Sequence, residues 1–435
     1  MMRALWEQKG ATLSVNIVTD PRAVDFIDAH ADALSSSFTQ VQMSERMRAR
    51  LERSTWIFSG MKAIREMGEA FPSLLDENGE RKPFEQFLND VRKVDETYNQ
   101  HYLRAEYEFA AASAQMAAKW ERFAEDGDRY NLQYRTAGDD RVRPEHAALD
   151  GITLPPSDSF WESYFPPNGW RCRCDVVQVR KSKYPVTPHD EAMQLGEMAT
   201  AADTKNIFRF NPGKQQRVFP AANPYTSSKC NGCELGAKEA LAKDEIPTGT
   251  LCQGCRLLQE YYHKIKRKLS NDTKPPHCQD YSTEYNGKVM ISPYHGADEL
   301  SENKRIAEFI SKRMEVKVYL LPCLDPGNPQ KASLRSSLLP AGVFEKKNPD
   351  YYIGGLIFDA KSMMDIKETN DTKKWKNDIE NRIKGAKKQA DNIVLEIPDF
   401  ITRKVIHSTI INYLNRSHKK RIILVKWKER LLLYG

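Results

Sequence analysis

The sequence contains no long apolar run, and nothing in it approaches the length of about 18 apolar residues that a membrane-spanning helix needs. Its N-terminal segment also lacks the apolar core of a secretion signal, because the acidic Glu7 follows soon after Arg3. We therefore expect no membrane span, and a soluble chain that is made in the cytosol.

Cysteine is scarce, with eight residues in the whole chain, and most of them stand in close pairs. In a cytosolic chain such pairs favour metal binding over disulfide bonds. Cys230 and Cys233 are followed, with 18 residues between, by Cys252 and Cys255. Two such pairs predict one tetrahedral site of four thiolates, which has no open position and therefore holds a structural zinc ion. A redox-active dithiol is the alternative.

An excess of positive charge is absent from the first part of the chain and present in the last. Residues 1–260 hold 33 Lys and Arg against 38 Asp and Glu, whereas residues 261–435 hold 33 against 21. A basic domain is typical of a protein that binds nucleic acid or another polyanion. The alternative is a solvated basic surface without a partner.

The length of 435 residues predicts two to four folding units. We place a helical part at 1–125, a compact unit with many turns at 126–225, the zinc unit with a linker at 226–284, and an α/β domain at 285–435. The predicted fold class is therefore multidomain α+β.

The helical part begins with Asp20 and Pro21, an N-cap followed by a proline that starts a helix. A second helix is expected near 44–69. From Pro83 to about Phe123 apolar residues recur with hardly a breaker, which predicts one long helix. Beyond residue 126 the sequence becomes rich in proline, glycine and tryptophan, which favours short strands and turns.

The C-terminal part alternates between helical and strand-like patterns, which predicts an α/β domain. The helices are expected at 302–313, 372–390 and 402–414, and the strands at 316–321, 350–353, 356–362, 393–397, 421–427 and 430–434.

Two carboxylates flank a predicted hairpin in this domain. Gly354 and Gly355 between two apolar strands are typical of a two-residue turn. The register that follows places Asp350 opposite Asp359, with Lys361 on the same face of its strand as Asp359. Opposed like charges destabilise a sheet, so a cation is expected between them.

A divalent ion, magnesium or zinc, held by Asp350 and Asp359 would remove this repulsion and would support phosphodiester cleavage, with Lys361 beside the attacking water. A salt-bridge cluster of the three residues on an exposed hairpin is the alternative interpretation.

The compact unit contains a series of short sequence motifs in a fixed order. The segment 134–146 is followed in order by Gly151, by 155–158, by Phe160 and Trp161, and by 166–174. This succession resembles the signature of the phage Mu F-like head morphogenesis family. The resemblance implies a minor capsid protein that acts near the portal, with portal or capsid proteins as partners. His146, Cys172 and Cys174 are either three metal ligands or a buried structural cluster, because Cys-x-Cys is tighter than the usual zinc knuckle.

The hairpin belongs to a second resemblance. Asp350, Asp359 and Lys361, in this order of helices and strands, resemble the PD-(D/E)xK restriction-endonuclease-like nucleases. More narrowly, residues 348–361 and 386–390 resemble the C-terminal toxin domains of contact-dependent inhibition (CdiA) proteins that act on transfer RNA. The resemblance implies a glutamate on the first helix, for which we choose Glu302 over Glu308 and Glu299. It also implies that Gln389 orients the site; a solvated surface amide is the alternative.

Together these features predict a head protein fused to a metal-dependent nuclease toxin, with transfer RNA as the favoured substrate and DNA as the alternative. An acidic immunity protein is expected as a separate chain. We expect the chain in the cytoplasm of the producing cell, and then with the virion or inside a target cell.

Two other functions fit the sequence. One is a metal-independent ribonuclease that uses Lys361 with His295 or His407. The other is a capsid protein without enzymatic activity, whose basic tail binds DNA.

Overall fold

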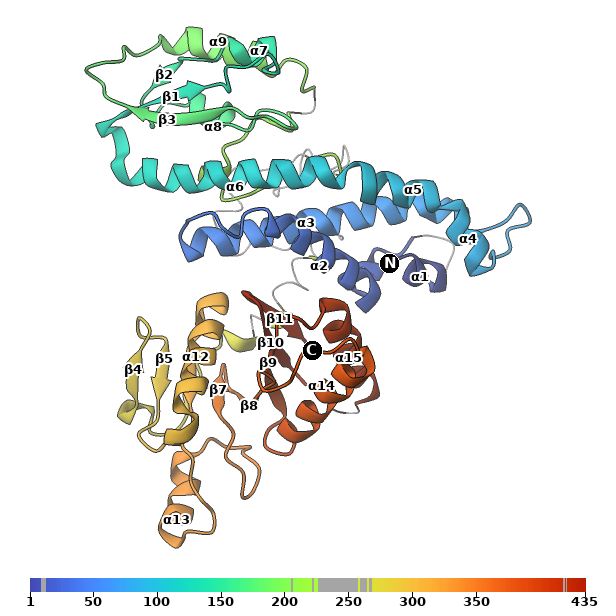
Figure 1. Ribbon diagram of the computed structural model, residues 1–435, viewed down its shortest axis with the longest axis vertical. Coiled ribbons are helices and arrows are strands. Elements are labelled where there is room, and N and C mark those ends of the chain that lie inside the picture. Colours follow the sequence, from blue (N-terminus) through green and yellow to red (C-terminus); the bar gives the residue numbers. More distant parts are fainter. Residues whose placement is uncertain are drawn as a thin grey trace. The chain divides into compact units, whose positions relative to one another are not determined.

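The computed structural model describes residues 1–8, 13–204, 206–220, 223–225, 257–258, 264–265, 268–417, 419 and 421–435. Cys230, Cys233, Cys252 and Cys255 lie outside these residues. The chain divides into two compact units, Met1–Gln259 and Glu260–Gly435. Across the described ranges, no helix combines the length and the apolar character that crossing a membrane requires. The mixed helical and sheet class is confirmed (Figure 1).

The first unit begins with helices, as the sequence predicts. They are α1 (Met2–Glu7), the 3-10 turn η1 (Val15–Thr19), α2 (Pro21–Ser36), α3 (Glu45–Ala70) and the 3-10 turn η2 (Phe71–Leu74). The side chain of Asp20 caps α2 by accepting the N–H of Arg22, and that of Ser44 caps α3 by accepting the N–H of Met47. Both helices thus begin where a side-chain oxygen satisfies a free backbone donor.

The single long helix predicted from residue 83 to about residue 123 is wrong, because the segment is divided. It forms α4 (Phe84–Asp90), α5 (Arg92–Glu96), the π-helical turn η3 (Thr97–His101) and α6 (Leu103–Asp126). The first break falls at Val91, whose ψ of 0° leaves the α-helical range. The π turn breaks the i to i+4 hydrogen-bond pattern without a proline or glycine to announce it.

The core around α2, α3 and α6 contains buried charge. The Nζ atom of Lys62 lies 2.8 Å from Oε2 of Glu106, and these two residues are 0% and 2% exposed. His30 also contacts this carboxylate, at 3.0 Å, and the hydroxyl of Tyr225 donates to it. Burial lowers the pKa of Lys62, so the ion pair must offset the loss of hydration.

The rest of the first unit is a small sheet with short helices around an aromatic core. Its strands are β1 (Asn131–Arg135), β2 (Thr153–Leu154) and β3 (Asp175–Val179), in the antiparallel order β2-β1-β3. Its helices are η4 (Gly127–Arg129), α7 (Pro144–Ala147), α8 (Phe160–Ser163), α9 (His189–Ala199) and α10 (Pro212–Gln215). Trp161 and Tyr134 are the largest fully buried side chains of its core.

The second unit contains an eight-stranded mixed sheet in the order β11-β10-β9-β8-β7-β6-β5-β4. The strands are β4 (Ser282–Glu284), β5 (Val289–Ile291), β6 (Val318–Leu320), β7 (Tyr351–Ile353), β8 (Leu356–Ser362), β9 (Asn392–Ile397), β10 (Ile423–Trp427) and β11 (Arg430–Tyr434). β8, β9 and β10 run parallel, as do β5 and β6, and the other neighbours are antiparallel.

Helices cover both faces of this sheet. α12 (Ala297–Met314) covers one face, and α14 (Thr372–Ala386) and α15 (Arg403–Arg416) cover the other. η7 (Cys278–Asp280) and α13 (Pro329–Leu338) also belong to this unit but bury no residues. Ile306 of α12 shares a core with Val394 on one face, whereas Ile379 of α14 shares a core with Ile393 on the other. The predicted order of elements is confirmed from α12 onward, although β4, β5 and α13 were not predicted and α14 ends at Ala386 instead of residue 390.

Candidate active site

The predicted hairpin between β7 and β8 is present. Ile353 pairs with Leu356, and the next pairs outward join Tyr352 to Ile357 and Tyr351 to Phe358, as the glycine turn predicts. Gly354 and Gly355 have φ values of 58° and 85°, which favour glycine. The turn therefore fixes the register of the strand that carries Asp359 and Lys361.

Regular pairing stops one step short of the predicted pair of Asp350 and Asp359. The backbone N–H of Asp350 donates to the carbonyl of Phe358, at 3.1 Å. Its side chain reaches further along β8, where Oδ2 accepts the N–H of Ala360 at 2.6 Å. Asp350 thus lies next to the carboxylate strand, but it is held by the backbone of Ala360 instead of standing directly opposite Asp359.

Asp359 is a buried carboxyl group in a negative environment. It is 2% exposed, and burial, followed by the charge of Asp350, raises its pKa to about 7. The Nζ atom of Lys361 lies 2.8 Å from Oδ2 of Asp359, and the two groups form an ion pair. The structure therefore brings Asp350, Asp359 and Lys361 together.

Asn303 of α12 is a site residue that the sequence analysis missed. Its Nδ2 donates to Oδ1 of Asp350 at 3.0 Å and lies 3.3 Å from Nε2 of His295. The hydroxyl of Tyr351 donates to the backbone carbonyl of Asn303 at 3.0 Å. A polar residue three positions before Ile306, on the apolar stripe of the helix, is the signal that could have identified it.

Glu302 and Glu299 of α12 act on different titratable residues. Glu302 is exposed, and its charge acts on Arg305 and Tyr351. Glu299 lies one turn earlier, on the same face as Asn303, and its charge contributes to the raised pKa of Lys361. Among the described residues, no hydrogen bond or ion pair joins Glu302 to the carboxylates of the hairpin.

Gln389 lies in the turn after α14, where its N–H donates to the carbonyl of Ala386 at 2.8 Å. Its side-chain Oε1 is buried and has no hydrogen-bond partner in the described residues. A buried amide oxygen of this kind is not a solvated surface group, but among the described residues no contact joins it to Asp350 or Asp359.

A second charged cluster lies on the neighbouring strands and was also missed. Glu396 of β9 is 1% exposed, and Arg305 of α12 forms a two-pronged ion pair with it, at 2.5 and 2.6 Å. Lys426 of β10 contacts the same carboxylate at 2.8 Å. Although burial opposes it, hydrogen bonding to Arg305 and Lys426 lowers the pKa of Glu396 to about 2. This cluster fastens α12 to the sheet.

The two histidines of the metal-independent alternative differ in position. His295 lies near the hairpin, but Nδ1 contacts the carbonyl of Leu321 at 2.7 Å and Nε2 contacts Asn303. Both ring nitrogens are thus engaged, which suits orientation of Asn303 better than proton transfer. His407 is 9% exposed in α15 and lies against the ring of Tyr434.

The donor set at the hairpin fits a hard divalent cation. Asp350 and Asp359 offer carboxylate oxygens, which such ions prefer. The Oδ2 atom of Asp359 is buried and lies 2.8 Å from the ammonium group of Lys361, so a cation bound there would share this carboxylate with Lys361. A cation there would relieve the charge repulsion that raises the pKa of Asp359.

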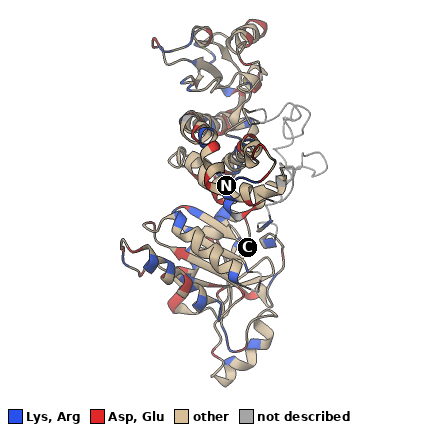
Figure 2. Cartoon of the chain, turned by 90° about the vertical axis from the view of Figure 1, so that its right-hand side faces the viewer, with Lys and Arg blue, Asp and Glu red and all other residues tan. Residues whose placement is uncertain are grey.

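The surface of the second unit is consistent with its basic composition. Lys331 and Arg335 are the charged residues of α13, the lowest helix in Figure 2, and no acidic residue accompanies them. α14 adds five basic residues against two acidic ones, which are Lys373, Lys374, Lys376, Arg382 and Lys384 against Asp378 and Glu380.

Comparison with known proteins gives one family match in each of the two compact units. Residues 77–177 match the family described as Phage Mu protein F like protein. Residues 346–429 match the Contact-dependent growth inhibition CdiA C-terminal domain, and this segment includes the hairpin. The chain therefore carries a phage Mu F-like domain and a CdiA C-terminal domain.

Two curated relatives resemble the first of these segments. The chain is 29% identical over 145 residues to the "Putative capsid assembly protein F" of Escherichia phage Mu, over 33% of this chain and 28% of that protein. It is 31% identical over 99 residues to the Mu-like prophage FluMu F protein of Haemophilus influenzae, over 21% and 23%. The chain thus spans about a quarter of the length of these relatives. No solved structure matches it.

Proposed function

We propose that the chain is a phage minor head protein fused to a nuclease toxin, whose C-terminal domain hydrolyses phosphodiester bonds with a divalent metal. The observation that carries this proposal is the buried pair of carboxylates at the hairpin, with Lys361 within 2.8 Å of Asp359. The match of residues 346–429 to the CdiA C-terminal domain supports a toxin. The proposed fold is of the PD-(D/E)xK restriction-endonuclease-like type.

The residues of the site have separate roles in this proposal. Asp350 and Asp359 hold the divalent ion, magnesium or zinc, which when bound supplies Lewis-acid activation and charge stabilisation. Asn303 and the N–H of Ala360 keep the two oxygens of Asp350 oriented. The ammonium group of Lys361 stabilises negative charge beside Asp359. Glu302 and Gln389 remain proposed members of the site, and the charge of Glu299 acts on Lys361.

The basic character of the second unit supports a polyanionic substrate. Phosphate contacts by Lys and Arg give affinity for RNA and DNA alike, so the charge alone does not select between them. We propose transfer RNA as the substrate, because of the likeness to the CdiA C-terminal domain, with DNA as the alternative.

The rest of the chain adds partners to this proposal. The Mu F-like domain suggests contact with portal or capsid proteins and an association with the virion. Cys230, Cys233, Cys252 and Cys255 are proposed to hold a structural zinc ion between the domains. A separate, acidic immunity protein would protect the producing cell before the toxin reaches a target cell.

A cleavage assay of the full-length chain tests the function. Transfer RNA and plasmid DNA are incubated with the protein in the presence of magnesium or in excess chelator. We expect cleavage that requires the metal and that Asp359→Ala abolishes. Asp399→Ala, which changes an exposed turn carboxylate, serves as the matched control.

The outcomes separate the alternatives. Full cleavage in excess chelator would favour the metal-independent ribonuclease. No cleavage of either nucleic acid, and growth inhibition on expression that Asp350→Ala does not relieve, would favour a capsid protein that only binds DNA.

A further inference from the structure

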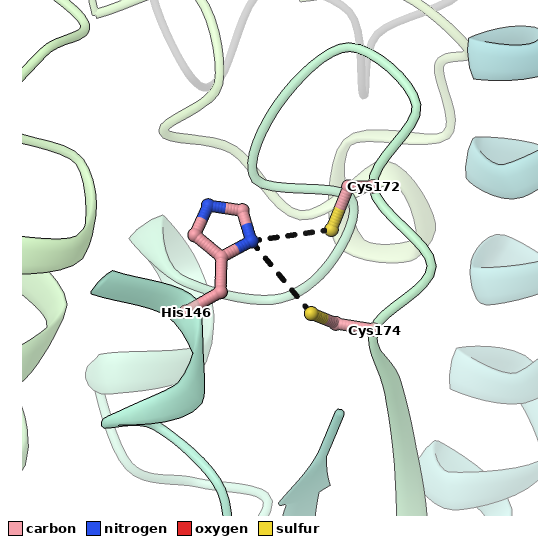
Figure 3. Close-up of side chains that lie close together, drawn as sticks. All are labelled: His146, Cys172 and Cys174. Atoms are coloured by element: carbon pink, nitrogen blue, oxygen red, sulfur yellow. Dashed lines mark hydrogen bonds between the residues drawn. The ribbon is translucent and has the colours of Figure 1, made fainter. Parts of the chain in front are cut away.

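Three residues of the Mu F-like domain lie together outside the proposed nuclease site. They are His146 of α7 and Cys172 and Cys174 of the segment that leads into β3 (Figure 3). Nδ1 of His146 lies 3.7 Å from Sγ of Cys172 and 3.7 Å from Sγ of Cys174. Their three ligand atoms all lie within 4.8 Å of one another.

These distances agree with a tetrahedral metal centre. Zinc bonds of about 2.3 Å to sulfur and about 2.05 Å to nitrogen, at a tetrahedral angle, place a sulfur and a nitrogen ligand about 3.6 Å apart. The two observed distances of 3.7 Å match this spacing. A hydrogen bond between a thiol and an imidazole explains one such contact, but a single ring nitrogen cannot form two directed bonds of this kind at once.

The backbone holds the two thiols on one side. The N–H of Cys172 closes a turn on the carbonyl of Gly169, and Arg171 has a φ of 60°, in the left-handed region. Arg173, between the cysteines, points elsewhere, because its guanidinium forms two 2.6 Å hydrogen bonds with Asp139. The close Cys-x-Cys spacing is thereby compatible with both thiolates binding the same metal ion.

The cluster is also largely removed from water. His146 is 4% exposed and Cys172 is 8% exposed. The buried hydroxyl of Tyr134 donates to Asn168 at 2.8 Å and also interacts with the thiol of Cys174. Two thiolates would carry a net charge of −2 into this interior, and a divalent cation cancels that charge.

We propose that His146, Cys172 and Cys174 bind a thiophilic divalent cation of the zinc class as a centre of their own. The ion fastens α7 to the start of β3, and a water molecule or the hydroxyl of Tyr134 takes the fourth position. The existence of this centre does not depend on the nuclease activity.

Peptide-resolved alkylation of the full-length, zinc-loaded chain tests the proposal. Iodoacetamide is added to the native protein with and without a zinc chelator, and each cysteine is followed by mass spectrometry. We expect the chelator to convert Cys172 and Cys174 from protected to alkylated. Cys278 and Cys323, which lie outside the cluster, are the internal controls and should be alkylated equally in both conditions.

A second measurement is needed because the buried thiols can stay inaccessible to iodoacetamide even after the metal has been removed. His146→Cys keeps three ligands, so this variant should retain its metal and, after cobalt loading, show a stronger sulfur-to-metal absorption band than the parent. Cys172→Ala with Cys174→Ala should lose one zinc ion per chain. Alkylation of Cys172 and Cys174 that ignores the chelator, together with an unchanged zinc content in the double variant, would overturn the proposal.

Discussion

The side-chain amide of Asn303 donates a 3.0 Å hydrogen bond to Asp350, and so connects helix α12 to the carboxylate hairpin. The other oxygen of Asp350 is held by the N–H of Ala360 at 2.6 Å. Both oxygens are therefore oriented from two directions, one through the helix and one through the neighbouring strand. Groups that orient a metal ligand commonly affect activity nearly as much as the ligand itself.

Asn303→Ala should reduce the proposed nuclease activity by about 10- to 100-fold, because Asp350 loses its orientation while both carboxylates remain. The metal concentration needed for half-maximal activity should rise as well. Cleavage rates measured over a magnesium titration check both effects. Asn370→Ala, at an exposed bend, is the control and should match the parent protein. An unchanged metal requirement in Asn303→Ala would show that the amide does not act through Asp350.

Asp359→Asn should stabilise the metal-free protein at neutral and alkaline pH. The pKa of Asp359 is raised from 3.8 to about 7, so the folded state keeps a proton that the unfolded state releases. The free energy of unfolding of the parent therefore falls as the pH rises from about 4 to about 7. The variant escapes this loss and should gain on the order of 3 kcal/mol over the parent between these limits.

Urea denaturation in chelator at several pH values measures this difference. Asp399→Asn removes an exposed carboxylate and should show no comparable gain. A constant difference between Asp359→Asn and the parent from pH 4 to pH 8 would contradict the assigned environment of Asp359.

Arg305→Ala should destabilise the second unit by about 2 kcal/mol, because the buried carboxylate of Glu396 keeps only Lys426 as a cationic partner. The pKa of Glu396 is lowered from 4.5 to about 2, so its stabilising contribution is present above about pH 4.5 and is lost as the pH falls toward 2. The difference between variant and parent should shrink over the same interval.

Lys304→Ala is the matched control for this experiment. Lys304 pairs with Glu284 on the surface, where an ion pair contributes about 1 kcal/mol or less. Denaturation curves that place the two variants at equal stability would show that burial of Glu396 has no energetic consequence.

Lys62→Met should destabilise the first unit by about 3 to 5 kcal/mol, since it leaves the buried Glu106 without its ammonium partner. Adding Glu106→Gln should recover part of this loss, because the uncompensated charge is then removed. Denaturation of the single and double variants measures the coupling energy between Lys62 and Glu106. Arg65→Ala, on the exposed side of the same helix, should change stability by less than about 1 kcal/mol.

Local rules explain why the sequence predicts the hairpin well. Gly354 and Gly355 are the residues that a turn with positive φ requires, and side chains alternate along a strand, so the register from Ile353 to Phe358 follows directly. The order of elements from α12 to β11 also follows from apolar periodicity. Such features depend on neighbours in the chain.

The contacts that were missed depend on packing between distant segments. Asn303 and Asp350 are 47 positions apart, and Arg305 and Glu396 are 91 apart, so only the placement of α12 on the sheet joins them. The choice of Glu302 followed its position along the helix, and the charge of Glu299, on the same helix, also acts on Lys361. The break at Val91 likewise has no proline or glycine to signal it.

The hairpin has a consequence for the order in which the proposed site assembles. Asp350 and Asp359 are nine positions apart in the chain, so a hairpin that forms within microseconds already brings them close. Asn303 joins them only after α12 has docked on the finished sheet. In the proposed nuclease the two carboxylates therefore come together before Asp350 is oriented, and tight metal binding at the hairpin requires that α12 has packed on the sheet.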